Sequence, residues 1–516
     1  MPLDRPDTSS ERRFTRRQAI GIGAGTVGAL AAAGYGVSRA VGGGSGSPPD
    51  FVLRPRPTIV ELGSRRASTW TFDGRLPGPE LRLRQGRPVR IRVENGLPQP
   101  TTVHWHGIRL RNPADGVPDF TQDAIKPGDA FVYEFTPPDA GTYFFHSHVG
   151  TQLDRGLYAP LIVDAAREQL SYDEEAVLVL DDWLDGVAGT PDAQYAKLRR
   201  SGMNMGGMSM GGGSMGGGSM GGGPMTGGMR GTHTTLAGAS PGLDDLAGLA
   251  NLMERGKLDP GDVQYPLYLI NGRPPDAPAQ VRARRGQRIR LRLINAASDT
   301  TFCFFVEGRS LTVTHTDGQP VEHVTTDALV LGMGERYDVL LDARDDGATR
   351  IFAMPLGKRG RAVAVLRSGR VTRRAPAADA PFQAPRRIAS YGDLRDATHT
   401  GPVRDPHVTR LDLAMKAPYA WTLGGQVLAH ADPIQAARGE AQRFVMRNLT
   451  MMPHPMHLHG HSFRPAGGGP RKDTILVAPR RQVTVDWVAD NPGDWAFHCH
   501  NVYHQEAGMM RKVQIA

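Results

Sequence analysis

The sequence predicts an all-β protein made of three β-sandwich domains, and three observations carry this prediction. Glycine (64) and proline (40) are frequent among the 516 residues, which is typical of short strands joined by turns. One strand-and-turn pattern occurs three times along the chain, as expected for repeated domains. Within the pattern, apolar and polar residues alternate, so that one strand face is buried and the other is solvated, as in an antiparallel sandwich.

The three copies of the pattern occupy residues 70–97, 268–297 and 421–450. Each copy has a turn glycine, a second glycine 12 to 14 residues later, and a strand that ends near an asparagine. These residues are Gly74, Gly86 and Asn95 in the first copy, Gly272, Gly286 and Asn295 in the second, and Gly425, Gly439 and Asn448 in the third.

The repeats divide the chain into domains at residues 51–170, 171–370 and 407–516, with an Arg/Ala/Pro-rich linker at 371–406. Residues 203–229 interrupt the second domain and contain 8 Met and 13 Gly. Such a segment cannot bury enough apolar surface to offset the entropy lost on ordering, so we expect a loop-like insert.

Residues 1–50 have the composition of an export signal followed by a flexible linker. Arg16-Arg17, preceded by Phe14-Thr15, resembles a twin-arginine motif, and an uncharged stretch rich in Ala and Gly follows. The alternative is a membrane anchor, but six glycines between Gln18 and Ser38 make a poor spanning helix. We expect a periplasmic, cell-envelope or secreted protein without a stable membrane span in its mature form.

Charge and cysteine content exclude several classes of protein. The net charge is +9, but the basic residues form no dense block, so we expect no nucleic-acid partner. No long apolar run follows the N-terminal segment, which excludes a polytopic membrane protein. The two cysteines, Cys303 and Cys499, exclude a disulfide framework, and the apolar sequence around Cys303 predicts a core thiol.

Ten of the 17 histidines lie in four short motifs. The motifs are His104-Trp-His106, His146-Ser-His148, His454-Pro-Met-His457-Leu-His459 and His498-Cys499-His500-Asn-Val-Tyr-His504. One His-x-His pair could be a solvated strand face, because residues i and i+2 share a side. Four motifs with a cysteine between two histidines predict a metal site. Imidazole-rich sites suit zinc, copper, iron or nickel, and two histidines with a cysteine and a distant methionine such as Met509 suit blue copper.

These four motifs, in this order, resemble those of the multicopper oxidases, the family that contains laccases and copper-efflux oxidases. The resemblance covers roughly residues 55–516, and every ligand motif is complete. It is closest to bacterial copper-resistance oxidases, which share the twin-arginine start, the axial methionine and the Met-rich insert. The resemblance implies a cupredoxin-like Greek-key β-sandwich in each of the three domains and four bound copper ions.

Residue by residue, the resemblance implies four copper positions. The type 1 copper takes His454, Cys499, His504 and Met509; the type 2 copper takes His104 and His457; the two type 3 coppers take His106, His146 and His500, and His148, His459 and His498. Strand geometry supports this division, since Cys499 points to one face and its two neighbours to the other. The first and third domains supply the three-copper cluster, and we expect the second domain to act as a spacer.

The implied reaction couples four one-electron oxidations of substrate to the reduction of O₂ to two waters, with Cys499 on the electron path. Protons need carboxylates near the cluster. Asp115 matches the acidic residue of the family loop, although it could be a turn aspartate before Gly116. Glu506 is a second candidate, but Gln505 stands where some relatives have an acid, which leaves the second donor open. Lys472-Asp473-Thr474 resembles a further family motif, to which we assign a structural role.

Two enzyme functions and one binding function remain open. The first is oxidation of Cu(I) to Cu(II) in copper tolerance, because the thioethers of the insert favour Cu(I). Met451 and Met452, beside His454, could form the Cu(I) site, or could be core side chains. The second is laccase-like oxidation of phenols and aromatic amines. The third is a non-enzymatic copper-binding protein. In each case we expect a monomer.

Overall fold

The computed structural model describes residues 48–201, 246, 248, 250, 255–370, 375–398, 401 and 403–516. The predicted twin-arginine signal and the predicted insert at 203–229 lie outside these residues. From Pro49 onward the chain forms one compact unit, and the division of this unit into three domains with the boundaries given above stays a prediction. No helix in the described part of the chain is long and apolar enough to cross a membrane.

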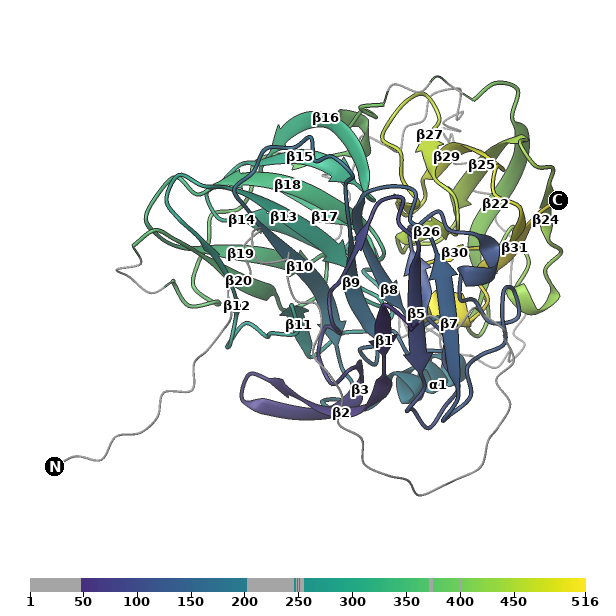
Figure 1. Cartoon of the computed structure of the whole chain (residues 1–516), viewed down its shortest axis with the longest axis horizontal. Helices are drawn as coiled ribbons and strands as arrows, with labels where there is room; N and C mark the ends of the chain where they lie inside the picture. The colour runs from purple at the N-terminus through teal and green to yellow at the C-terminus, as the bar shows by residue number, and fades with distance from the viewer. Residues whose placement is uncertain are drawn as a thin grey trace, which may run out of the picture. The chain divides into compact units, whose positions relative to one another are not determined.

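Strands dominate the described residues, which confirms the all-β prediction (Figure 1). Helical residues are few in the described part of the chain, and include residues 246, 248 and 250 besides five short elements with defined ends. These are α1 (Pro191–Ser201), α3 (Val502–Glu506), and the 3-10 turns η1 (Asn112–Ala114), η2 (Tyr391–Asp393) and η3 (Leu428–His430).

The first part of the described chain, purple and blue in Figure 1, forms sheets with the orders β1-β5-β7, β4-β9-β8-β6 and β2-β3. The strands are β1 (Phe51–Leu53), β2 (Pro55–Leu62), β3 (Arg65–Phe72), β4 (Leu81–Arg84), β5 (Val89–Glu94), β6 (His104–His106), β7 (Ala130–Phe135), β8 (Gly141–His146) and β9 (Tyr158–Asp164).

The central part, teal and green in Figure 1, forms two larger sheets. Their orders are β11-β10-β13-β18-β15-β16 and β12-β20-β19-β14-β17-β21. The strands are β10 (Glu174–Trp183), β11 (Leu267–Ile270), β12 (Ala279–Ala283), β13 (Arg288–Asn295), β14 (Phe302–Val306), β15 (Leu311–Thr316), β16 (Gln319–Thr326), β17 (Ala328–Leu331), β18 (Arg336–Asp342), β19 (Gly347–Pro355), β20 (Ala362–Ser368) and β21 (Ile388–Ala389).

The last part of the chain, green to yellow, forms a second pair of facing sheets. Their orders are β23-β22-β25-β29-β27 and β24-β31-β30-β26-β28. The strands are β22 (His407–Lys416), β23 (Ala420–Leu423), β24 (Ile434–Ala436), β25 (Ala441–Asn448), β26 (His454–Leu458), β27 (Phe463–Pro465), β28 (Thr474–Val477), β29 (Gln482–Val488), β30 (Gly493–Cys499) and β31 (Met510–Ile515).

The sheets are mixed, whereas the alternating pattern suggested antiparallel sheets. β5, β13 and β25 each pair with a parallel neighbour on one side and an antiparallel neighbour on the other. Alternation reports only that one strand face is buried, and a Greek-key connection can place a parallel strand on that sheet as well. The predicted sandwich class is therefore confirmed, but the strand directions were not predictable from the pattern.

The asparagine at the end of each repeated strand has the same role in all three copies. The side-chain oxygens of Asn95, Asn295 and Asn448 accept hydrogen bonds from the backbone N–H two residues later, at 2.9–3.0 Å. Their amide groups donate to carbonyls about 30 residues further along the chain. Each asparagine thus fixes a turn and joins it to a second segment, and in the first and third copies this turn leads into a histidine motif.

A buried ion pair joins the first, central and last parts of the chain. Both terminal nitrogens of Arg336 on β18 donate to the carboxylate of Asp473, at 2.7 and 2.6 Å. The Nε of Arg336 donates to the carbonyl of Thr142 on β8, at 3.3 Å. All three residues are inaccessible to solvent. A fork of donors with a carboxylate in this geometry fixes both distance and orientation.

Replacing Arg336 by Met should therefore destabilise the protein by about 3–5 kcal/mol, because the buried charge of Asp473 loses its partner. Chemical denaturation of the copper-free protein would measure this change. Arg344→Met is the matched control. Arg344 is 75% exposed at its side chain and pairs with Asp342 at 3.3 Å, so its loss should cost less than about 1 kcal/mol. Equal losses in the two variants would contradict this account of Arg336.

Candidate metal centre

Strand pairing brings the four histidine motifs together from distant parts of the sequence. β6 pairs with β8 so that His104 lies opposite His146, with Trp105 on the buried core face between the two histidines of its strand. β26 pairs with β30 so that His457 lies opposite His498. Because side chains alternate along each strand, the histidines of a motif project from one sheet face toward those of the facing motif.

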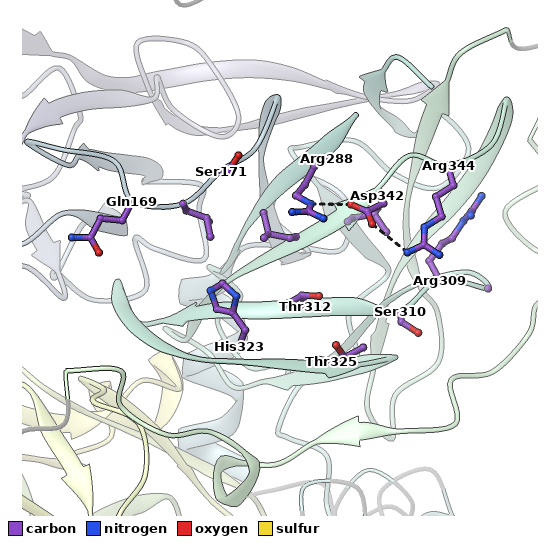
Figure 2. Close-up of a pocket in the computed structure, with 14 residues that line it drawn as sticks. Gln169, Ser171, Arg288, Arg309, Ser310, Thr312, His323, Thr325, Asp342 and Arg344 are labelled. Carbon is purple, nitrogen blue, oxygen red and sulfur yellow. Dashed lines mark hydrogen bonds and ion pairs between the residues drawn. The ribbon is translucent and has the colours of Figure 1, made fainter. Parts of the chain in front are cut away.

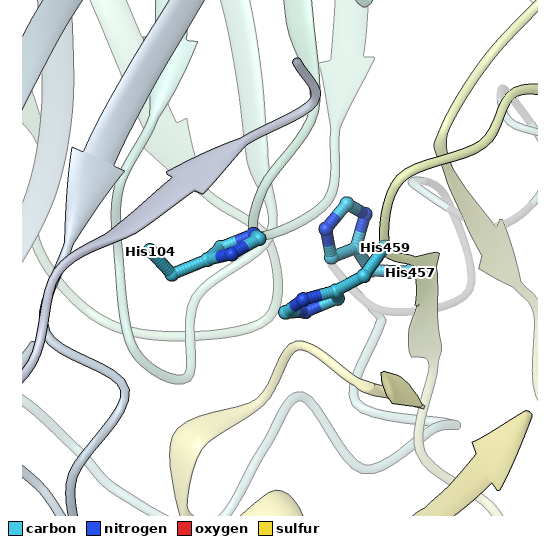
Figure 3. A group of neighbouring side chains, drawn as sticks. All are labelled: His104, His457 and His459. Carbon is cyan, nitrogen blue, oxygen red and sulfur yellow. The ribbon is translucent and has the colours of Figure 1, made fainter. Parts of the chain in front are cut away.

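Eight of these histidines form one buried array, which we call the histidine array: His104, His106, His146, His148, His457, His459, His498 and His500. Ring nitrogens lie within 4.8 Å of one another in the groups His104–His106–His146, His104–His457–His459 and His148–His459–His498. Figure 3 shows His104 reaching from the first part of the chain toward His457 and His459 on the last part. The Nε2 of His500 lies 3.2 Å from the Nδ1 of His106, which brings the eighth histidine into the array.

A second buried group contains His454, Cys499 and His504. The Cys499 sulfur lies 3.6 Å from the Nδ1 of each histidine, and the two Nδ1 atoms are 3.1 Å apart. Met509 is also buried, and its carbonyl accepts the backbone N–H of Cys499 at 3.0 Å. The structure thus places all four residues predicted for this group in one neighbourhood.

Cys499 at the end of β30 connects the two groups. Its side chain belongs to the second group, whereas its neighbours His498 and His500 belong to the histidine array. The opposite directions of adjacent side chains, predicted from strand geometry, are observed.

The array has the unpaired donor atoms that a metal site requires. Among the described residues, five buried ring nitrogens of the array have no hydrogen-bond partner: the Nε2 atoms of His104, His146, His148 and His457, and the Nδ1 of His500. The opposite nitrogens of several rings are held by backbone oxygens, such as that of Asp115 for His104 and that of Asp473 for His457. Unpaired buried nitrogens are costly, and a ring fixed on one side with a free nitrogen on the other is the usual form of a metal ligand.

Comparison with known proteins identifies the family. Models of the multicopper oxidase family match residues 56–168, 248–370 and 400–516. The chain belongs to the multicopper oxidase family. The protein is therefore a copper-dependent oxidoreductase that uses O₂, and the predicted family and enzyme class are confirmed.

Curated relatives include copper-resistance proteins and laccases. The chain is 37% identical to the multicopper oxidase MmcO of Mycobacterium tuberculosis, over 98% of this chain and 97% of that protein. It is 28% identical to a copper resistance protein A homolog of Pseudomonas syringae pv. tomato, with 91% and 92% of the two chains covered. It is 27% identical to laccase-2 of Botryotinia fuckeliana, with 88% and 79% covered.

Solved structures of bacterial multicopper oxidases share the fold. The multi-copper oxidase from Pseudomonas thermotolerans matches with a TM-score of 0.65 at 26% identity, over 91% of this chain and 100% of that chain. The multi-copper oxidase from Pseudomonas parafulva matches with a TM-score of 0.64 at 29% identity, over 90% and 100%.

Burial keeps most candidate copper ligands of this multicopper oxidase in the neutral form that binds metal. Desolvation lowers the pKa values of seven array histidines and of His454, and neighbouring imidazoles lower most of them further: His106, His146, His148, His457, His459, His498 and His500. His504 differs. Desolvation lowers its pKa, but hydrogen bonds to Asp262 and Cys499 outweigh this effect and raise the pKa to about 10.

Of the two predicted proton donors, the structure brings Asp115 to the array. Its Oδ2 lies 2.9 Å from the Nδ1 of His459, and its Oδ1 lies 3.3 Å from the Nδ1 of His104. Glu506 lies in α3 after His504, where its carboxylate accepts from Gln505 at 3.2 Å, and burial raises its pKa. Among the described residues, no hydrogen bond or ion pair joins Glu506 to the array.

Two acidic residues near the candidate ligands were not predicted as site residues. Asp473 was assigned a structural role, but its Oδ1 lies 3.3 Å from His106 and 3.4 Å from His457. The Lys472-Asp473-Thr474 motif was the feature of the sequence that could have identified Asp473 as a site residue. Asp262 accepts from the Nε2 of His504 at 3.0 Å, and its sequence carries no signal, because the contact spans 242 residues. Asp262, in the central part of the chain, thus contacts a candidate ligand, a role that the interpretation of this part as a spacer did not include.

Figure 2 shows a pocket of 670 Å³ whose lining includes none of the candidate ligands. It is lined by central residues such as Arg288, Arg309 and His323, and Asp342 pairs with two of its arginines. It shares no residue with the histidine array or with the group around Cys499.

The buried histidines predict that the copper-free protein loses stability as the pH falls from about 7 to 5. A histidine with a lowered folded pKa contributes stability that is complete above its unfolded pKa of about 6.5 and is lost below it, at about 1.4 kcal/mol per pH unit. Carboxyl groups whose pKa values burial strongly raises act in the opposite direction; they are Asp154, Asp181, Asp182 and Asp259. The ten histidines with lowered pKa values outnumber these four. Denaturation at several pH values would measure the slope.

His315 provides a test of this mechanism away from the copper ligands. Desolvation lowers its pKa to about 4. His315→Gln should reduce the slope of stability against pH, whereas His430→Gln, at an exposed position, should leave it unchanged. A stability that rises on acidification would contradict the prediction.

Proposed function

We propose that this multicopper oxidase binds four copper ions and couples four one-electron oxidations of substrate to the reduction of O₂ to two waters. The type 1 copper would be held by His454, Cys499, His504 and Met509, and the type 2 copper by His104 and His457. The type 3 pair would be held by His106, His146 and His500 on one ion and by His148, His459 and His498 on the other. The observation that supports this assignment is the complete set of family motifs, gathered into two buried groups with unpaired ring nitrogens.

Bound copper would supply the one-electron redox chemistry, and the protein residues would supply orientation, a path and protons. Residues 498–500 form a continuous covalent link between the two groups. Asp115 is placed between His104 and His459, where a carboxyl group can hold a proton beside the array. Asp473 is the second carboxylate beside the array, and Glu506 remains a candidate donor on the α3 side.

We propose Cu(I) as the substrate, in a role in copper tolerance. Met451 is 38% exposed, whereas Met452 is buried in the core. The Met451 sulfur accepts from the Nε of Arg480 at 3.5 Å, so a soft ion from solution that binds this thioether would displace the guanidinium. The carbonyl of Met451 accepts the backbone N–H of Asp259 at 3.0 Å, and the nearby Asp262 contacts His504. The backbone of Met451 is thus joined to the segment that carries Asp262, the carboxylate in contact with one candidate type 1 ligand. The copper resistance relatives favour the same substrate class.

The alternative substrate class is phenols and aromatic amines, which the laccase relatives favour. Oxygen uptake by the copper-loaded protein distinguishes the two, with Cu(I) or a phenol as the sole reductant. Uptake with Cu(I) at a much higher kcat/KM supports the first proposal. Uptake with phenol alone would contradict it.

We further propose that the protein is exported by its twin-arginine-type signal to the periplasm, cell envelope or medium, and acts there as a monomer. Copper tolerance is a function of that compartment in this proposal. Fractionation of cells that express the full chain, compared with an Arg16→Lys/Arg17→Lys variant, would test the export route.

Replacing Cys499 by Ser should abolish the blue absorption band near ~600 nm and reduce the copper content from about four ions to about three per molecule, because the thiolate is the softest ligand of the type 1 group. Turnover should fall to background. Cys303→Ser, which alters a buried core thiol on β14, is the matched control and should retain band, copper and turnover. A Cys499→Ser protein that still turns over would overturn the assignment.

Replacing Met451 by Leu should lower kcat/KM for Cu(I) by about 10-fold and leave phenol oxidation nearly unchanged, because leucine keeps the volume but removes the soft sulfur. Met354→Leu on β19, in a sheet without candidate ligands, serves as the control. Deleting the predicted insert at 203–229 should likewise depress Cu(I) oxidation more than phenol oxidation. Equal loss for both substrates would count against the Cu(I) proposal.

A further inference from the structure

His504 is hydrogen-bonded at its backbone and at its imidazole ring. The two residues that make these hydrogen bonds, Asn501 and Asp262, are both bound by Asp299 in the central part of the chain. The backbone N–H of His504 donates to the Oδ1 of Asn501 at 3.3 Å, since Asn501 is the N-cap of α3. Its side-chain Nε2 lies 3.0 Å from the Oδ2 of Asp262. The ring of Trp421 lies against its face, with centroids 3.8 Å apart. The position of this imidazole therefore depends on Asn501 and Asp262.

Asp299 contacts both of these residues. Its Oδ1 accepts from the Nδ2 of Asn501 at 2.5 Å and from the backbone N–H of Asp262 at 3.1 Å. Its Oδ2 accepts from the backbone N–H of Val263 at 2.8 Å and from the ammonium of Lys358 at 2.7 Å. One carboxylate thus receives four donors, and three of them belong to the two segments that hold His504.

The site around Asp299 is fully buried and compact. Asp299 is 1% exposed and Asn501 is 1% exposed, while Lys358 also donates to the Asp299 carbonyl and to Thr300. Gly261 brings the loop of Asp262 against Asp299. A Cβ at Gly261, whose φ is +135°, would lie 2.6 Å from the Asp299 Oδ2. The loop can approach Asp299 in this way only because residue 261 has no side chain.

We propose that Asp299 is a positioning residue of the type 1 copper site, which acts on His504 through Asn501 on the backbone side and through Asp262 on the ring side. This inference rests on the proposed function, because it assumes that His504 is a type 1 ligand. Lys358 would hold the Asp299 carboxylate in place. Outer residues that orient a ligand imidazole affect metal affinity and electron density at the ligand. Through Asp299, the central part of the chain would influence the properties of the type 1 copper, which accepts electrons from the substrate.

Asp299→Asn tests the proposal directly. An amide at this position would turn an N–H group toward the donors of Val263 or Lys358, and the loop of Asp262 would move away from His504. In the copper-loaded variant we expect a shifted blue band, an altered type 1 EPR spectrum and a higher type 1 reduction potential, because His504 loses a carboxylate that stabilises Cu(II). Removal of type 1 copper by a chelator should become about 10-fold faster.

Asp338→Asn is the matched control for this substitution. Asp338 is a buried carboxylate paired with Arg290 and Arg292, and no candidate copper ligand contacts it among the described residues. The control should lose stability and keep the wild-type spectrum and potential. A merely structural role for Asp299 would give the same result in both variants, and that outcome would overturn the proposal.

Gly261→Ala provides a second route that leaves the carboxylate unchanged. The new Cβ would push the Asp262 loop away from Asp299, so we expect a spectral and potential shift in the same direction as in Asp299→Asn. Gly347→Ala is its control, because Gly347 has a similar φ of +141° but open space where the Cβ would lie. This pair keeps the inference testable if Asp299→Asn does not fold.

The outcomes separate this inference from the proposed function. If copper-loaded wild-type protein lacks the blue band, the assignment of His504 fails and the inference fails with it. If the wild type has the band, Asp262→Asn shifts it, and both Asp299→Asn and Gly261→Ala leave spectrum and potential unchanged, only the role of Asp299 is overturned.

Discussion

Many imidazoles are buried in this protein with ring nitrogens that lack protein partners, and their burial costs free energy. The rest of the structure must offset this cost. Five such nitrogens converge in the histidine array, and no side chain among the described residues satisfies them. A protein keeps such an arrangement when a bound ion compensates for it. The strands β6, β8, β26 and β30 are accordingly positioned by strong, redundant features: strand registry, asparagine-fixed turns and the ion pair between Arg336 and Asp473. Binding of copper by this chain is thus also a contribution to its folding free energy.

The central part of the chain supplies no predicted copper ligand, yet its charged residues contact residues of, or next to, both groups. Arg336 reaches Asp473 beside the array, and Asp299 reaches the segments on both sides of His504. Burial alone would raise the pKa of Asp473, but the guanidinium of Arg336 lowers it well below its usual range. Asp473, a buried carboxylate beside the array, is therefore fixed by a residue on another part of the chain, so the electrostatics of the array depend on more than the parts that carry its histidines.

Sequence alone was sufficient for the fold class, the family and the gathering of the ligand motifs, because these depend on local patterns. Alternation reports a buried face, and a His-x-His motif on a strand reports two side chains on one side. The same patterns do not predict which residues far apart in the sequence contact each other. Asp262, Asp299 and Arg336 stand in unremarkable sequence, and their roles depend on contacts across more than 100 residues. Parallel strand pairs were missed for the same reason, since alternation does not encode strand direction.

The separation of β6 from β26 by about 350 residues has a consequence for biosynthesis. A nascent chain that lacks its last strands contains only four histidines of the array, His104, His106, His146 and His148, and it contains neither His454 nor Cys499. Full metal loading must therefore follow completion of translation. A prematurely terminated chain cannot bind the full set of metal ions. The metal content per molecule therefore reports the fraction of full-length chains in a preparation.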